Sequence, residues 1–187
     1  ITFVATCNSI CYTGARPILI DTDENSWQMD LDVLQEFLEK ETIQINGACH
    51  YKKDGKRIPV LMPVHVLGNM CDMDRLILLA KQHNLVVVED STEALGSYYK
   101  GKHAGSFGLM GTFSYNGNKI ITTGGGGMIV TNDETLARKA KHLTTQAKCD
   151  PFEYKHDEIG YNYRLVNVAA AMGVAQMELL PSFIQRK

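Results

Sequence analysis

The sequence predicts an α/β fold: a three-layer α/β/α sandwich around a largely parallel, mixed sheet. Two observations lead to this prediction. Patterns typical of strands and of helices alternate along the 187 residues, as they do when helices connect parallel strands. Residues 85–90 form an unbroken apolar run that ends in two carboxylates, as expected of a strand whose two faces are both covered by helices.

The first part of the chain predicts strands and helices in alternation. Residues 17–21 form a short apolar run that ends in a carboxylate, and residues 59–64 form a second one, so we expect two buried strands. Residues 31–40 and 72–83 repeat apolar side chains at helical spacing. The positions that set this spacing are Leu31, Leu34, Phe37 and Leu38 in the first helix, and Leu76, Leu79 and Ala80 in the second.

The middle of the chain predicts strands and one hairpin. Residues 85–90 are the third buried strand. Residues 98–103 are typical of a short hairpin that turns at Gly101. Two further strand-like runs follow, at residues 111–115 and 127–131.

The last part of the chain predicts two helices. Asn132 is the expected N-cap of the first, which has acidic residues in its first turn and ends at about Gln146. The second begins near Asn167. Its expected buried stripe consists of Val168, Ala171, Met172, Ala175 and Leu179.

The composition excludes several classes of protein. With 44% hydrophobic and 21% charged residues, the chain is typical of one globular domain. Its formal net charge of −2 provides no basic surface for nucleic acid. No apolar run approaches the roughly 20 residues that cross a bilayer, and the first residues do not resemble a signal peptide.

The cysteines argue against disulfides and metal binding. They are odd in number, scattered, and contain no CxxC pair, which disfavours a disulfide framework or a structural zinc site. We therefore expect a reducing, cytoplasmic location. The five are Cys7, Cys11, Cys49, Cys71 and Cys149.

Asp90 is the first candidate for chemistry. It closes an apolar strand, and ligands in open α/β sheets bind beyond the carboxyl ends of the strands. A carboxylate there is costly to desolvate unless it meets a cation. The alternative is that Asp90 simply caps the following turn, a common use of Asp.

Lys119 is the second candidate. It lies between two predicted strands and shortly before a tract of four glycines, Gly124 to Gly127. A lysine buried at such a place becomes a nucleophilic amine, as Schiff-base chemistry requires. The alternative is a hairpin with an exposed lysine. The tract does not match a phosphate-binding P-loop, because Lys119 precedes the glycines.

Together the two segments are more specific. Asp90 is followed by Ser114 and Lys119 in the pattern Ser-x-x-x-x-Lys, then by glycines and another strand. In this the chain resembles the DegT/DnrJ/EryC1/StrS sugar aminotransferases, whose fold is the type I large domain of pyridoxal-phosphate (PLP)-dependent transferases. The resemblance runs along the whole chain. Its motifs are residues 2–8, 63–68, 88–96, 113–127 and 160–165.

The resemblance implies that the cofactor is pyridoxal 5'-phosphate. Lys119 would hold it as a Schiff base and move a proton between the cofactor carbon and the sugar carbon. Asp90 would pair with the pyridine nitrogen and keep it protonated, so that the ring accepts electrons. Ser114 would bind the phosphate.

Three further positions follow from the resemblance. Phe3 matches the aromatic residue that stacks on the pyridine ring. Glu93 stands where many relatives have Gln beside the cofactor hydroxyl, and an ionised Glu cannot donate a hydrogen bond there. Asn162 matches a residue that reaches across a dimer interface to the neighbour's phosphate, which implies a homodimer.

The resemblance also sets the expected domain and substrate. Family members are about twice this length, so residues 1–187 are expected to be part of the large domain, without its N-terminal segment and without the small C-terminal domain. The Gly117-Asn118-Lys119 segment and the polar loop from about Gly47 to Arg57 are similar to enzymes of the bacillosamine and legionaminic acid branches. These aminate nucleotide-linked 4-keto-6-deoxy sugars for surface glycans, with glutamate as the implied donor.

Two other functions remain open at this stage. One is a PLP-dependent sugar dehydratase of the same fold, but those relatives replace the Schiff-base lysine with His, whereas this chain has Lys119. The other is a non-catalytic binding or regulatory module, which needs neither Lys119 nor Asp90. His65 is interpreted as a core residue that satisfies a hydrogen bond. Arg164 either holds a substrate or anchors the chain.

Overall fold

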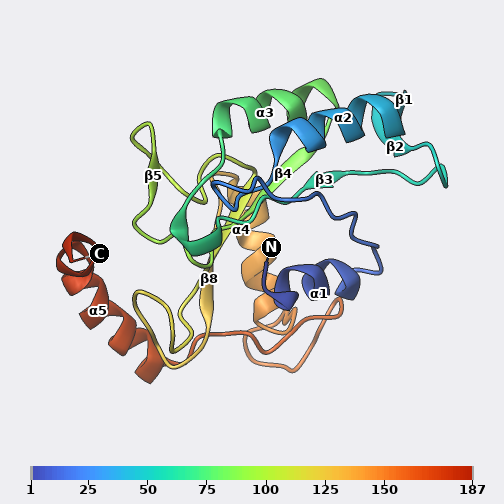
Figure 1. Ribbon diagram of the computed structural model, residues 1–187. Helices are drawn as coiled ribbons and strands as arrows, with labels where there is room; N and C mark the ends of the chain where they lie inside the picture. The colour runs from blue at the N-terminus through green and yellow to red at the C-terminus, as the bar shows by residue number, and fades with distance from the viewer. Residues whose placement is uncertain (1, 187) are drawn as a thin grey trace.

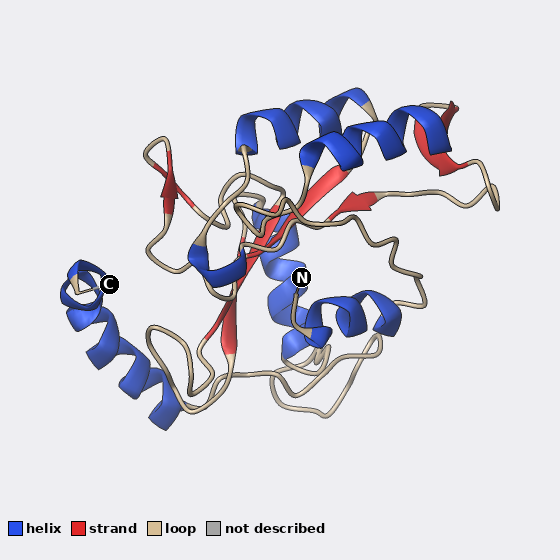
Figure 2. Ribbon diagram, in the orientation of Figure 1, coloured by secondary structure: helices blue, strands red, loops and turns tan. Residues whose placement is uncertain are grey.

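The computed structural model describes residues 2–186 and is organised around a mixed sheet (Figure 2). The strand order is β3-β4-β7-β8, in which β3 pairs with β4 and β4 with β7 in parallel, while β7 and β8 are antiparallel. The largely parallel, mixed sheet is therefore confirmed. The strands are β3 (Val60–Leu61), β4 (Val86–Asp90), β7 (Met110–Ser114) and β8 (Gly127–Val130).

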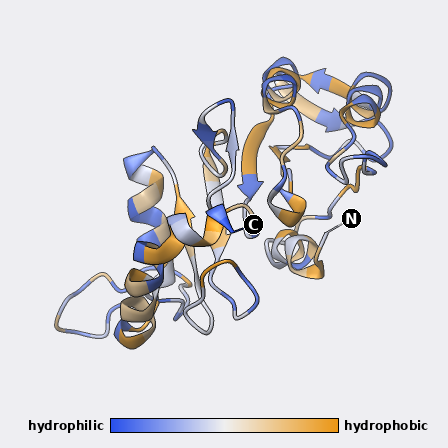
Figure 3. Ribbon diagram, turned by 60° about the vertical axis from the view of Figure 1, so that its left-hand side comes forward, coloured by the Kyte–Doolittle hydropathy of each residue, from blue (hydrophilic) through white to orange (hydrophobic). Residues whose placement is uncertain are grey.

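Helices lie on both sides of this sheet. Helices α2 (Leu31–Glu41) and α3 (Met73–Gln82) pack against each other on one side, where α3 contacts β4. Helix α4 (Glu134–Thr144) contacts β8, and Figures 1 and 3 show it on the other side of the strands. The predicted three layers are thus present.

Helices α2 and α3 form where caps and apolar spacing agree. The Asp30 carboxylate accepts hydrogen bonds from two backbone N–H groups of the first turn of α2, and Asp72 accepts one at the start of α3. The predicted leucines face inward and join one core with Met73 and Val87. Each fully buried leucine contributes roughly 2 kcal/mol.

The other elements are shorter or lie outside the sheet. They are α1 (Val4–Tyr12), the hairpin β1 (Thr42–Ile45) and β2 (Ala48–Tyr51), the 3-10 turn η1 (Val66–Gly68), the predicted hairpin β5 (Tyr98–Tyr99) and β6 (Lys102–His103), and α5 (Asn167–Gln185). None of the helices in residues 2–186 is long and apolar enough to cross a membrane.

The strand predicted at residues 17–21 is wrong. Apolar side chains alone do not make a strand, because the backbone needs a neighbour to pair with. This segment lies outside the sheet, Leu19 is 75% exposed, and the nearest pairing is an isolated bridge between Thr22 and Met29.

The first part of the polar loop expected from about Gly47 to Arg57 is the second strand of a hairpin. Strands β1 and β2 pair antiparallel around Asn46 and Gly47, which both have positive φ (49° and 76°). An Asn-Gly pair is the strongest short-range hairpin signal, because this turn requires positive φ at both positions.

The two C-terminal helices correct the sequence analysis in detail. Helix α4 is capped by Asp133, not Asn132, and ends at Thr144. Helix α5 begins at Asn167 as predicted, but its expected buried stripe is wrong: Val168 is 77% exposed and Leu179 is 53% exposed. The helix buries a different side, on which Leu180 joins a core cluster with Phe113 and Ile121, and the predicted stripe faces away from that cluster.

Candidate active site

The candidate site lies at the carboxyl edge of two parallel strands. Asp90 ends β4 and Ser114 ends β7, and the register pairs Asp90 with Thr112. Because parallel strands end at the same edge, both side chains are delivered to the place where α/β sheets bind ligands.

Asp90 is held at both carboxylate oxygens. Its Oδ1 accepts a bond from the backbone N–H of Thr92 at 3.2 Å, as the turn-capping alternative requires. Its Oδ2 accepts a bond at 2.6 Å from the hydroxyl of Thr6, on helix α1 and 84 residues away. Capping therefore explains only one oxygen, and the other ties α1 to the sheet edge.

Lys119 faces a carboxylate instead of open solvent. Its Nζ lies 3.2 Å from Oε1 of Glu93, and its side chain is 17% exposed. A turn closed by the Lys119 N–H and the Asn116 carbonyl places the lysine after β7. The alternative of an exposed hairpin lysine does not fit this geometry.

Glu93 is anchored on its other oxygen. The backbone N–H of Leu67 donates to Oε2 at 2.8 Å. That bond, together with Lys119, lowers the pKa of Glu93 below its ordinary value, although partial burial acts in the opposite direction. Glu93 is therefore a carboxylate near neutral pH, and it accepts hydrogen bonds but donates none.

The remaining predicted residues lie as follows. Ser114 Oγ accepts from the Asn116 N–H at 3.3 Å, which leaves its own hydroxyl hydrogen able to donate. Phe3 occupies the N-cap position of α1, three residues before Thr6, and is 79% exposed. Asn162 is exposed and forms a backbone bridge with Thr145; no hydrogen bond within residues 2–186 joins it to the sheet edge.

Two contact residues were missed by the sequence analysis. Thr6 belongs to a segment used only for its resemblance, and the helical spacing of Thr2 and Thr6 was the available signal. Their hydroxyls lie 3.1 Å apart. Leu67 acts through its backbone, and an apolar side chain gives no signal of that role.

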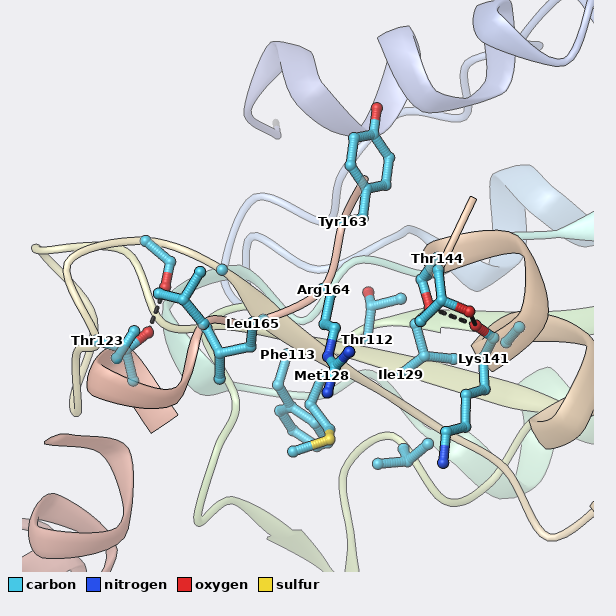
Figure 4. Close-up of a pocket in the computed structure, with 18 of the residues that line it drawn as sticks. Thr112, Phe113, Thr123, Met128, Ile129, Lys141, Thr144, Tyr163, Arg164 and Leu165 are labelled. Atoms are coloured by element: carbon cyan, nitrogen blue, oxygen red, sulfur yellow. Dashed lines mark hydrogen bonds between the residues drawn. The ribbon is translucent and has the colours of Figure 1, made fainter. Parts of the chain in front are cut away.

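Two cavities lie beside the site, and neither is lined by Lys119. The larger, about 1250 Å³, lies between β7–β8, α4 and residues 162–166; Figure 4 shows Arg164 directed into it and Tyr163 pointing away. Of the predicted cofactor-binding residues, Asn162 alone lines it, and Arg164, which was left open as a substrate residue, lines it as well. The other, about 1000 Å³, includes Thr6 in its wall. We locate the site by its reactive groups, because Lys119 and its carboxylate partner lie outside both cavities.

Comparison with known proteins shows the family of this chain. The family model of the DegT/DnrJ/EryC1/StrS aminotransferases matches residues 1–187. GDP-perosamine synthase of Escherichia coli O157:H7 is 44% identical over 187 residues, which cover 100% of this chain and 47% of that protein.

Solved structures show the same fold. PseC of Helicobacter pylori, an aminotransferase involved in the biosynthesis of pseudoaminic acid, superposes with a TM-score of 0.81 at 32% identity over 97% of this chain and 45% of that one. A Streptococcus pneumoniae protein, solved in forms named for PMP and for PLP, gives TM-scores of 0.82 and 0.79 at 27% identity. These cover 100% and 97% of this chain, and 50% and 47% of the other.

The chain spans about half the length of the relatives it matches. The match nevertheless extends from the first residue to the last. This chain belongs to the DegT/DnrJ/EryC1/StrS aminotransferase family.

Proposed function

We propose that this chain forms part of a PLP-dependent sugar aminotransferase. The observation that carries the proposal is the Lys119–Glu93 pair, 3.2 Å apart, on the sheet edge where Asp90 is also held. A partly buried lysine at this edge provides the amine that a Schiff base requires once it is released from Glu93, and a binding module has no use for such a lysine.

The residues at this edge fit the cofactor by their chemistry. Lys119 offers an amine for the aldehyde, Asp90 a carboxylate for the pyridine nitrogen, and Ser114 a hydroxyl for the phosphate. Phe3, at the start of the helix that Thr6 ties to Asp90, would cover the ring. When bound, PLP supplies an electron sink for the carbon that loses its proton.

The chain's own groups hold and move protons. Asp90 is fixed by Thr6 and Thr92 and would provide the carboxylate that pairs with the pyridine nitrogen. Glu93 would accept a hydrogen bond from a cofactor hydroxyl, whereas a Gln could donate one. Lys119, once released from Glu93, would move a proton between the cofactor carbon and the sugar carbon.

The relatives support a nucleotide-linked sugar as the substrate. A relative at 44% identity is a GDP-perosamine synthase, and PseC acts in the biosynthesis of another sugar. We infer that the reaction converts a nucleotide-linked 4-keto-6-deoxy sugar to its 4-amino sugar for surface glycans, with glutamate as donor, in the cytoplasm.

The whole protein is proposed to be larger and dimeric. Residues 1–187 would form part of its large domain, with an N-terminal segment and a small C-terminal domain outside this chain. In a homodimer, Asn162 would bind the phosphate held by the partner subunit. Its exposure agrees with a role in an interface.

An amino-transfer assay tests the proposal. The protein with its natural ends is incubated with PLP, glutamate and a nucleotide-linked 4-keto-6-deoxy sugar, and 2-oxoglutarate and amino sugar are quantified. One 2-oxoglutarate for each amino sugar is expected. Loss of a sugar hydroxyl without 2-oxoglutarate would indicate a dehydratase instead, and no turnover with any donor would favour a binding module.

A further inference from the structure

A buried polar set lies next to the candidate site and is not part of it. Glu89 precedes Asp90 on β4, is 0% exposed, and faces His65, which is 1% exposed. His65 Nε2 lies 3.0 Å from Glu89 Oε2. The backbone N–H groups of Gly105, Phe107 and Gly108 also donate to this carboxylate, at 2.6–2.8 Å. Four donors compensate a charge that would otherwise be costly to bury.

This set fixes the start of η1. His65 immediately precedes the turn, and its own N–H bonds to the Asp90 carbonyl at 3.0 Å. A third buried polar residue, Gln28, is 2% exposed and bonds to both backbone groups of Val66. Its Oε1 accepts from the Val66 N–H at 3.1 Å, and its Nε2 donates to the Val66 carbonyl at 3.0 Å.

The turn held in this way has a costly conformation. Leu67 has a φ of 55°, which a non-glycine residue adopts only when its surroundings impose it. This conformation directs the Leu67 N–H at Glu93 Oε2. Gly68 allows the approach, since a Cβ there would lie 3.0 Å from the Glu93 carbonyl oxygen.

We propose that Gln28, His65 and Glu89 are positioning residues: they hold residues 66–68 against Glu93 and thereby place its carboxylate beside Lys119. The contacts run without a gap from the buried set through Leu67 to Glu93 and then to Lys119. The placement of Glu93 stands on these contacts alone, while its use toward a cofactor rests on the proposed function.

The test measures Lys119 itself, without cofactor. The protein with its natural ends is treated with a small amine-reactive reagent, and peptide mass spectrometry gives the labelling rate of each lysine. Because an amine in an ion pair is a poor nucleophile, Gln28→Ala should raise the Lys119 rate about three- to tenfold, the range expected for losing one hydrogen bond. Gln44→Ala is the matched control. The exposed Gln44 amide donates to the carbonyl of His83, which follows α3 in the sequence, whereas η1 precedes α3.

A double-mutant cycle separates positioning from general loosening. Glu93→Gln removes the carboxylate, so Gln28→Ala should cause no further rise in that background. An equal rise in both backgrounds, or no rise in folded Gln28→Ala, would overturn the proposal. If Gln28→Ala unfolds and all lysines label, Gln28→Glu decides by the same cycle, because it keeps the size and one of the two bonds to Val66.

The two proposals can fail separately. If the cycle behaves as expected but PLP forms no adduct with Lys119, the positioning set stands and the proposed function fails. If PLP labels Lys119 and the cycle is additive, the function stands and the positioning role is wrong.

Discussion

Two glutamates near the end of β4, Glu89 and Glu93, each face a basic residue, and they differ in how many hydrogen bonds their carboxylates accept. Glu89 is 0% exposed and accepts four hydrogen bonds, including the one from His65. Glu93 has a side chain that is 37% exposed and meets one backbone N–H and one amine. The Glu89 carboxylate therefore has no acceptor capacity left for a ligand, while the Glu93 carboxylate does.

The difference indicates that the two carboxylates have separate roles, one structural and one chemical. A buried carboxylate that accepts hydrogen bonds at both oxygens keeps the bonded backbone in place, because a shift of that backbone would leave the buried charge unpaired. A partly exposed pair exchanges partners at low cost, since solvent replaces what is lost. Stability should therefore depend on Glu89, and chemistry on Lys119 and Glu93.

The largest expected effect is on activity. Lys119→Ala should lower the rate of amino transfer by about 10³-fold or more, because the amine both holds the cofactor and moves the proton. Lys102→Ala, at an exposed lysine on β6, should change the rate less than about twofold. Steady-state kinetics with saturating PLP provides the measurement. Retained activity in Lys119→Ala would remove the basis of the proposed function.

The next largest effect is on stability. Glu89→Ala should lower the free energy of unfolding by about 3–5 kcal/mol, since it leaves His65 and three backbone N–H groups without their acceptor. Glu36→Ala, in an exposed pair with Lys40, should cost less than about 0.5 kcal/mol. Urea unfolding measures both. Similar small losses in the two variants would show that the buried pair does not hold the sheet edge.

The two glutamates should also make stability depend on pH. For Glu89, burial raises the pKa, but the bonds from His65, Gly108 and Gly105 outweigh it, and the net pKa lies below the ordinary 4.5. Glu93 is lowered as well. A lowered folded pKa contributes stability above the unfolded value, and that stability is lost as the pH falls through the folded value.

The melting temperature should therefore not depend on the titration of these two groups near pH 7. It should fall as the pH drops below about 4.5. In Glu89→Gln this acid loss should become smaller. If the melting temperature of that variant falls by the same amount at acid pH, other carboxylates cause the fall.

The smallest effect is expected at Glu93. Glu93→Gln should change the free energy of unfolding by at most about 1 kcal/mol, because solvent screens a pair of this exposure. A Gln there keeps an acceptor for the Leu67 N–H. A loss as large as that of Glu89→Ala would remove the distinction between the two pairs.

The sequence could predict elements whose signal is local. Helices α2 and α3 and strand β4 carry their own spacing and caps, and they were predicted to within two residues at each end. Residues 17–21 have the same apolar character, but a strand also needs a neighbour, which local spacing does not reveal. The stripe of α5 failed for a related reason: an apolar face predicts burial only where another element covers it.

The candidate site was predictable in its residues more than in its contacts. Lys119, Asp90 and Glu93 were predicted from a pattern, but the sequence separation of 26 between Glu93 and Lys119 leaves their distance undetermined. The bond from Thr6 to Asp90 spans 84 residues and depends on where α1 packs. The Leu67 N–H is directed by a positive φ, which leucine does not predict.

The central claim is that Lys119 is the lysine that carries the cofactor. The most direct measurement is to incubate the protein with its natural ends with PLP, reduce it with borohydride and locate the adduct by peptide mass mapping, with residues 1–187 as a parallel sample. We predict one cofactor adduct, on Lys119, that is absent from Lys119→Ala. A protein that takes up no cofactor on Lys119, or carries it on another lysine, would contradict the claim.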